Sequence, residues 1–313
     1  MTDLNASKNL SPTERSLLAK IADLHELPVT GAFNLRANGE AAARRSSPHI
    51  EIRPKTDRPG IDVLVKPGTK GEQVHIPVIL TREGLNDLVY NTFVIGEGAD
   101  VLIIAGCGIH NPGEAQSGHD GIHEVFVEAG ARLRYVEKHL GEGVGRRVLN
   151  PKTIVHVARN GVAELELVQL GGVDDTRRET EADVAAGGRL LLTERLLTEE
   201  TQQAKSEVKV VLAGRGARAE VLSRSVARDR SRQDFFVEMT AGAPVKGHIS
   251  CDGIVMDQAE ISSTPALRVR HGEAEMTHEA AIGRIDGDQL IKLMTMGLTR
   301  DEAIREILAA YLS

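Results

Sequence analysis

Three side chains near the end of the chain have the chemistry of metal ligands. Cys251 lies in the segment GHISCDGIVMD, and the adjacent pair His278 and Glu279 lies in MTHEAAIGRI. Thiolate, imidazole and carboxylate groups hold soft and borderline metals. The sequence therefore predicts a metal-binding constellation here, although a cysteine in an apolar strand is also commonly just a small buried hydrophobe. Neither a CxxC nor an HxxH motif accompanies these residues.

Strand periodicity indicates which of these side chains share a face. Side chains alternate between the two faces of a strand, so Cys251 lies on the face of Ile249, and His278 on the face of Met276. Glu279 then points to the opposite face. Cys251 and His278 are 27 residues apart, and residues one repeat apart in a solenoid stack at about 4.8 Å. A Cys251–His278 stack is therefore reasonable, while Glu279 would need a bulge, another surface or a second subunit.

A second cluster is expected in a glycine-rich loop, GCGIHNPGEAQSGHDGIHE. It holds one thiol and three imidazoles within 17 residues, namely those of Cys107, His110, His119 and His123. These groups could bind a transition metal. In the alternative interpretation the segment is a surface loop in which the glycines allow a sharp turn and the histidines are solvated.

Two common enzymatic signatures are absent from the sequence. There is no GxxxxGK[ST] phosphate-binding loop, which disfavours nucleotide hydrolysis by this chain. There is also no GxSxG motif to support a serine nucleophile. We therefore expect a protein without independent catalytic turnover.

A recurring unit between about residues 90 and 285 must position the candidate ligands. Each copy has a glycine-containing turn followed by alternating apolar residues. The marker glycines are spaced by 26 to 32 residues, at Gly98, Gly130, Gly161, Gly187, Gly216, Gly242 and Gly272. Periods of this size are typical of repeating supersecondary units, and strand–turn coils fit the pattern better than paired helices. The sequence favours a mainly β fold, a parallel β-helix, over the alternative of an antiparallel sandwich with similar turn spacing.

The segments outside the repeat have their own signals. The run Ser11-Pro12-Thr13-Glu14 predicts the start of a short amphipathic helix, because it combines a capping serine, an early proline and a capping-box glutamate. Alternating apolar residues at 50–52, 61–65 and 74–78 predict edge-type strands.

The end of the chain is expected to be a helical hairpin. One helix should cover Asp288 to Met296 and end at Gly297, and a capping box at Thr299 and Glu302 should begin the next. We therefore predict three parts: a helix and edge-strand region over residues 1–70, a β-helix core over 71–285, and a helical docking segment over 286–313.

Composition narrows the class of protein. A formal charge of −7 argues against nucleic acid or an anionic membrane as the main partner. No apolar run approaches the roughly 20 residues that span a bilayer, and the N-terminal MTDLNASKNLSPTE has neither a basic start nor an apolar core typical of an export signal. Two cysteines far apart do not form a disulfide framework. These features predict a cytoplasmic location.

With these residues in hand, the chain resembles the SufB/SufD family of iron–sulfur cluster assembly scaffolds. The resemblance runs from about residue 70 to the C-terminus, and it is carried by the segments GIHEVFVEAGARLRYVEKH, GHISCDGIVMD, SSTPALRV and THEAAIGRIDGDQLIKLMTMGLTRDEA. It implies a right-handed parallel β-helix with a C-terminal helical domain. It also implies docking on SufC, an ABC-type ATPase, and the building of transient iron–sulfur clusters at a subunit interface.

The resemblance also implies roles for particular residues. Cys251 matches the cysteine of a C-D motif in B-type subunits, and His278 and Glu279 match a His-Glu pair, so these three are the expected cluster ligands. The STP signature at residues 263–265 is more D-like. This mixture suggests a compact, stand-alone form that acts as a homodimer in place of the B–D heterodimer. The residues expected to dock the ATPase are Gln289, Leu290, Leu293, Met294, Ile304 and Leu308.

Two other functions stay open at this stage. The chain could be a structural, SufD-like partner of a cluster-bearing paralogue. It could also be a β-helix enzyme acting on polysaccharide, although such enzymes usually display aromatic platforms and the aromatic content here is only 3%. Under the scaffold hypothesis the further partners are a sulfur donor and apo-protein acceptors.

Overall fold

The computed structural model of the protein describes residues 10–24 and 31–312. Most of the N-terminal segment in which we found no export signal, residues 1–9, lies outside the described residues. No helix in the described ranges is long and apolar enough to span a bilayer.

Two sheets of ten strands each make up the body of the described chain. The first sheet holds β1 (Ala32–Ala37), β2 (Glu40–Arg45), β5 (Lys70–Leu80), β7 (Asp100–Asn111), β9 (Arg132–Gly143), β12 (Val162–Gln169), β14 (Arg189–Thr198), β16 (Arg218–Ala227), β18 (Lys246–Val255) and β20 (Glu275–Gly283). The second holds β3 (Ile50–Pro54), β4 (Gly60–Val65), β6 (Asn86–Ile95), β8 (Ser117–Val127), β10 (Arg147–Leu149), β11 (Lys152–Val157), β13 (Asp175–Val184), β15 (Gln203–Leu212), β17 (Arg232–Ala241) and β19 (Glu260–Val269).

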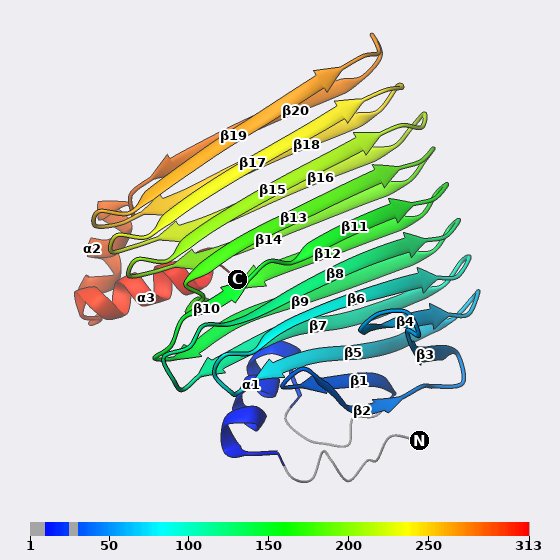
Figure 1. The fold of residues 1–313 in the computed structure, drawn as a ribbon. Helices are drawn as coiled ribbons and strands as arrows, with labels where there is room; N and C mark the ends of the chain where they lie inside the picture. The colour runs from blue at the N-terminus through cyan, green and yellow to red at the C-terminus, as the bar shows by residue number, and fades with distance from the viewer. Residues whose placement is uncertain (1–9, 25–30, 313) are drawn as a thin grey trace.

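The chain alternates between these sheets and climbs by one rung with each pair of strands (Figure 1). From β4 onward, neighbouring strands within a sheet are parallel, as in the pairing of β14 with β16 and of β16 with β18. The result is a β-solenoid of about 8 turns. The predicted solenoid is therefore confirmed, and the parallel pairing excludes the antiparallel sandwich.

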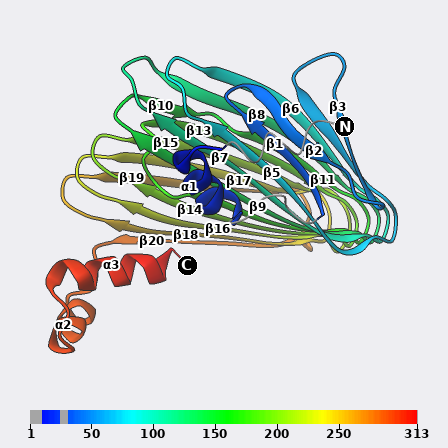
Figure 2. The same cartoon turned by 90° about the horizontal axis from the view of Figure 1, so that it is seen from below.

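Alternating hydrophobicity explains why the strands stack in this way. In β14 every second residue is buried, with Leu190 and Leu192 at 3% and 0% exposure. These inward side chains belong to one continuous apolar cluster that fills the space between the sheets. Each strand buries only its inward-facing side chains, against the neighbouring rungs and the opposite sheet. The alternation of apolar and polar residues must therefore recur in every repeat. Seen from below, the two walls form a flattened tube (Figure 2).

Several of the marker glycines occupy the turns that precede strands of the first sheet. Gly98 and Gly130 both adopt a φ of 64°, a left-handed conformation that most side chains disfavour. The recurring glycine signal is therefore a turn requirement of the backbone.

The N-terminal elements cover the first rungs. Helix α1 (Pro12–Ala22) begins with the predicted capping box between Ser11 and Glu14, and it packs against β5, β7 and β9. Gly106 permits this contact, because a side-chain carbon there would lie 2.6 Å from the carbonyl oxygen of Ile21. The strands predicted around residues 50–78 exist, but only β3 is at a sheet edge. β4 and β5 lie inside the sheets, because β3 and β1 pair along their outer sides.

The C-terminal hairpin also forms as predicted. Helix α2 (Gly287–Thr295) is followed by Gly297 at a φ of 102°, and α3 (Arg300–Tyr311) begins with a capping box between Thr299 and Glu302. The hairpin lies at the side of the solenoid (Figure 1), where α3 packs against Val226 of β16 and Ile254 of β18.

Candidate functional site

Cys251 lies on the inner face of β18, one rung before the end of the solenoid. Its exposure is 3%, and Ile249 on the same face is fully buried. In the register between β18 and β20, Cys251 pairs with Ala280, and Ile249 pairs with His278. Cys251 and His278 therefore share a face as expected, but they are offset by two residues along neighbouring strands. The offset arises because register partners on β18 and β20 are 29 residues apart in the sequence, whereas Cys251 and His278 are 27 residues apart.

Burial affects the chemistry of this cysteine. It raises the pKa of the Cys251 thiol above the ordinary value, and the nearby carboxylates of Asp252 and Glu194 act in the same direction. The protonated thiol is consequently favoured in the isolated subunit. A ligand or partner that stabilises the thiolate would have to overcome this preference.

Glu279 points to the outer face of β20, as strand parity predicts. Its register partner is Ser250, and its carboxylate lies 3.5 Å from Nε2 of His248. The side chain is 68% exposed. Cys251 and Glu279 of the same chain are thus on opposite faces of one sheet, so a cluster ligated by both would need ligands from different surfaces or subunits.

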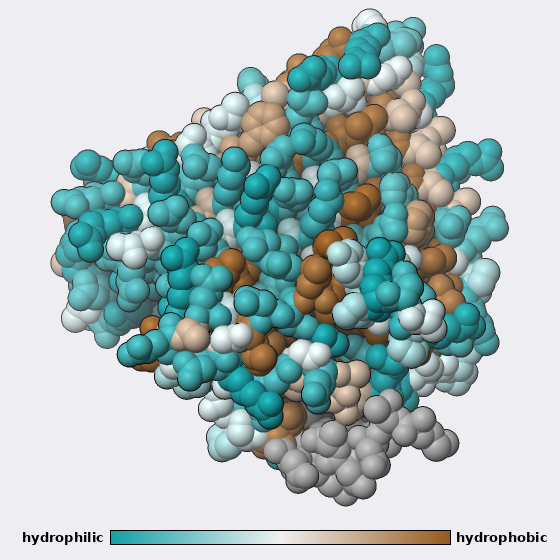
Figure 3. Space-filling model, in the orientation of Figure 1, coloured by the Kyte–Doolittle hydropathy of each residue, from teal (hydrophilic) through white to brown (hydrophobic). Residues whose placement is uncertain are grey.

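The last rung leaves the inner face of the solenoid uncovered. β19 and β20 are the terminal strands of their sheets, and most of their residues are partly or fully exposed. Val269 and Ile282 are 52% and 43% exposed, while Leu267 and Met276 are only partly buried against the core. In Figure 3, apolar side chains reach the upper end of the molecule, where these strands lie. Edge strands with unpaired backbone groups and apolar side chains are templates for pairing with another chain.

The second predicted cluster is inside the solenoid and does not form a surface loop. Cys107, His119 and His123 line one enclosed cavity of about 20 Å³ between the sheets. His110 does not line it, because it lies on the opposite face of β7 from Cys107. Its nearest carboxylate is Glu142, at 3.9 Å.

Sequence reasoning missed two residues of this cavity, Glu137 and His139. Both are buried on β9, at 3% and 2% exposure. The signal that could have found them is parity, since they share the inward face of β9 with Leu133 and Tyr135.

A buried ion network extends from this cavity along the solenoid interior. Arg178 donates to Glu137 Oε2 and to His139 Nδ1, each at 3.0 Å, and its Nε lies 3.8 Å from Glu194 Oε2. Ser206 donates a hydrogen bond of 2.7 Å to the same Glu194 oxygen. Burial opposes ionisation of Glu137, but the neighbouring His139 ring and the charge of Arg178 outweigh it and hold the pKa of Glu137 well below its usual range. Burial dominates at Glu194 and raises its pKa.

None of these clusters is a preformed metal centre within one chain. Among residues 10–24 and 31–312, no group of three or more His, Cys, Asp or Glu side chains is arranged to hold a metal ion. Any metal site therefore requires a second subunit or a movement of side chains.

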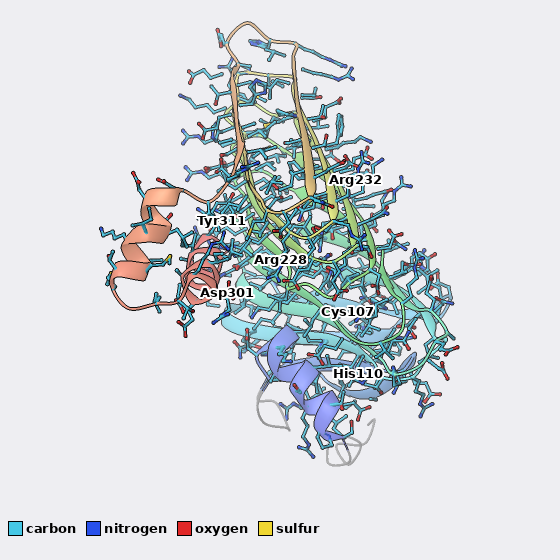
Figure 4. The ribbon with its side chains drawn as sticks, turned by 90° about the vertical axis from the view of Figure 1, so that its left-hand side faces the viewer. Cys107, His110, Arg228, Arg232, Asp301 and Tyr311 are labelled. Atoms are coloured by element: carbon cyan, nitrogen blue, oxygen red, sulfur yellow. The ribbon has the colours of Figure 1, made fainter. Side chains whose placement is uncertain are left out.

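The predicted docking residues divide into two groups. Ile304 and Leu308 of α3 are 9% and 8% exposed and pack against Val226 of the solenoid, so they anchor the helix on its own protein. Figure 4 shows Tyr311 and Arg228 where α3 meets the solenoid.

The docking residues predicted on α2 are more accessible. Gln289 is exposed, Leu290 and Leu293 are half-buried, and Met294 is 42% exposed. Sequence reasoning missed two further exposed apolar side chains at this end, Ile291 at 61% and Met296 at 74%.

The chain is thus a long parallel β-solenoid with a cysteine buried near its open end and an appended helical hairpin. The comparison with protein families identifies it further. Residues 80–311 match the SufBD core domain of the SUF system for iron–sulfur cluster assembly. The chain belongs to the SufBD family.

Curated relatives agree with this assignment. The chain is 30% identical over 247 residues to an iron–sulfur cluster assembly SufBD family protein of Archaeoglobus fulgidus, covering 77% of this chain and 66% of that protein. It is 28% identical over 244 residues to a SufBD family protein of Methanocaldococcus jannaschii, covering 77% of each chain. A relative from Methanothermobacter thermautotrophicus (strain Winter) is 27% identical over 234 residues, covering 74% of this chain and 56% of that protein. The chain thus spans less than two thirds of the length of some of the relatives that it matches.

Proposed function

We propose that this protein is a cytoplasmic scaffold subunit on which iron–sulfur clusters are built and from which they are transferred, with a SufC-like ABC ATPase as partner. Membership of the SufBD family supports a role in cluster assembly. The observation that carries the proposal is the position of Cys251, buried one rung inside an open solenoid end. In this role the protein holds and releases its inorganic cargo without catalytic turnover of its own.

A second copy of the chain is the proposed occupant of the open end. Exposed apolar side chains on β19 and β20, including Val269 and Ile282, continue the inner core and would be covered by the same surface of a partner. A two-fold interface of this kind is self-complementary. The proposal also requires that Glu279 of one subunit reach Cys251 of the other at this interface, because the two side chains lie on opposite faces of the sheet within one chain.

The proposed ligands divide the chemistry between them. Cys251 would supply a thiolate for iron or sulfide, and His278 and Glu279 would supply borderline and hard donors. A cluster held by few protein thiolates is expected to be weakly bound and transferable. Closure of the ATPase on the exposed part of α2 would then change the interface that holds it.

Isolation of the native complex tests the assembly. The expected result is an ATPase subunit together with this chain as the single SufBD-family subunit. A second, longer homologue at equal stoichiometry would instead support the SufD-like structural role. Anaerobic reconstitution tests the site. Cluster uptake should be lost in the Cys251→Ser, Glu279→Ala double variant. Uptake should be retained in Glu275→Ala, which removes a carboxylate from the same face of the same strand.

A further inference from the structure

The interior cavity brings two imidazole nitrogens to one point. His119, Gly121 and His123 alternate along β8, and all three face inward and line the cavity. A side-chain carbon built on Gly121 would lie 3.0 Å from Nε2 of His123 and 3.4 Å from Nε2 of His119. Both nitrogens therefore point into the space that this glycine leaves empty.

The other nitrogen of the His119 ring is held by a carboxylate. Nδ1 of His119 lies 3.1 Å from Asp87 Oδ2, and the Asp87 carboxylate is also bound by Arg36 through two hydrogen bonds. Nδ1 is consequently the donor, and Nε2 faces the cavity. No hydrogen bond to this Nε2 occurs among the described residues, although His119 is only 5% exposed.

The tautomer of His123 follows from its neighbours. Oδ1 of Asn91 accepts a hydrogen bond from the backbone N–H of Ile61, so the amide nitrogen of Asn91 faces Nε2 of His123 at 3.2 Å. Nε2 is therefore an acceptor. Nδ1 then donates to the hydroxyl of Tyr135 at 2.6 Å. The Nε2 atoms of both histidines thus face the same space, and that of His123 accepts a hydrogen bond from Asn91 there.

Cys107 supplies a third donor from the opposite wall. It lies on β7 of the first sheet, is 2% exposed and lines the same cavity. Its thiol makes no hydrogen bond to the described residues. One sulfur and two imidazole nitrogens are a typical donor set for Zn²⁺ and similar ions. A histidine that donates its other N–H to a carboxylate is the usual outer-shell arrangement of such sites.

We propose that this cavity binds a divalent transition-metal ion through Cys107 Sγ and the Nε2 atoms of His119 and His123. The thiol releases its proton to solvent as the metal–sulfur bond forms. Because the donors are not gathered at coordinating distances in the structure, the two rings must turn further inward over Gly121. Nε2 of His123 then exchanges its hydrogen bond with Asn91 for the metal. This site is separate from Cys251, and it does not depend on the proposed scaffold role.

A Cys251→Ser protein allows a direct test, because Cys107 is then the only thiol in the chain. The protein is produced in medium in which cobalt replaces zinc, and its metal content and absorption spectrum are measured. We expect one Co²⁺ per chain with a sulfur-to-cobalt charge-transfer band. Adding Cys107→Ser should abolish this band, and adding His119→Gln or His123→Gln should lower the cobalt content by at least about tenfold.

Two further variants separate ligation from folding. His110→Gln changes the histidine that lies outside the cavity and should leave cobalt content and spectrum unchanged. Gly121→Ala removes no ligand but fills the space between the rings, so it should reduce cobalt content in a protein whose circular dichroism is unaltered. The proposal is overturned if the Cys251→Ser protein takes up no cobalt, if the charge-transfer band survives Cys107→Ser, or if His110→Gln loses as much metal as His119→Gln.

Discussion

Cys251 of β18 and Ala280 of β20 are register partners, so the nearest neighbour of the buried thiol on the last strand is a methyl group. His278 lies two residues back along that strand, beside Ile249. A small side chain at position 280 leaves room next to the sulfur at the open end of the solenoid. The arrangement suits a cargo that enters from the interface rather than through the wall of the tube.

Arg178 is expected to be essential for the stability of the solenoid interior. Removing it in Arg178→Ala leaves Glu137 and Glu194 buried without their cation, and breaking a buried pair in this way costs about 3–5 kcal/mol. Arg177→Ala is the matched control, because its side chain is 61% exposed and its ion pair with Glu179 is worth about 1 kcal/mol or less. Urea unfolding should show a large loss for the first variant and little change for the second. Equal losses would contradict a special role of the buried network.

Glu194 should make stability depend on pH in the opposite sense from its neighbour Glu137. Burial raises its folded-state pKa above the ordinary 4.5, so the folded state binds more protons than the unfolded state in the window just above that pH. The contribution of Glu194 to stability is therefore lost as pH rises from 4.5. Glu194→Gln cannot ionise and should gain stability relative to the wild type over this window.

Urea midpoints of the wild type and Glu194→Gln, measured from pH 4.5 towards neutrality, check this expectation. Glu220→Gln, at an exposed position on β16, serves as the control and should run parallel to the wild type. Parallel profiles for Glu194→Gln as well would show that the carboxyl at position 194 does not titrate differently in the folded state.

The packing of α1 should depend on Gly106. In Gly106→Ala the new methyl group would lie 2.6 Å from the carbonyl oxygen of Ile21 and 2.7 Å from that of Lys138, so the helix or the strand must shift. Overpacking of this kind costs about 1–3 kcal/mol. Gly272→Ala is the control, because a side-chain carbon there has no neighbour within 4 Å. Thermal unfolding should separate the two variants, and an unchanged midpoint for Gly106→Ala would argue against close packing of α1.

The two C-terminal helices should respond differently to substitution. Ile291→Asp on α2 places a charge at a side chain that is 61% exposed, so it should reduce copurification of the ATPase while the fold is retained. Lys292→Glu serves as the control, because it changes the charge of the same helix by more than Ile291→Asp does. Ile304→Ala on α3 should instead destabilise the chain by about 2–4 kcal/mol, because Ile304 packs against Val226. Undiminished copurification with Ile291→Asp would remove α2 from the docking surface.

Much of the fold could be predicted from the sequence because its signals are local and repeated. The turn glycines and the alternating apolar residues predict the solenoid, and the capping boxes at Ser11 and Thr299 predict where two helices begin. The pairing of strands beyond the repeat was less accessible. Residues 61–65 form an interior strand and not an edge, because the partner β3 comes from an antiparallel hairpin that carries no repeat signal.

The site was only partly predictable for a related reason. The alternation of side chains along a strand predicted that Cys251 and Glu279 lie on opposite faces. The two-residue offset between Cys251 and His278 could not be predicted, because it depends on the number of residues in one turn of the solenoid, and that number varies between repeats. The cysteine and histidines near residue 107 were expected in a loop. They line the interior because β7 and β8 continue through the glycine-rich segment as strands.

The central claim, that the cluster site is completed between two subunits, is tested most directly by mixing two inactive chains. Cys251→Ser and Glu279→Ala subunits are prepared separately and as a coexpressed, doubly tagged mixed dimer, and iron and sulfide uptake is measured under anaerobic reconstitution. In a two-fold dimer, the mixed species retains one site with Cys251 from one chain and Glu279 from the other. We predict uptake in the mixed dimer and none in either single-variant dimer. A mixed dimer as inactive as its parents would contradict a site shared between subunits.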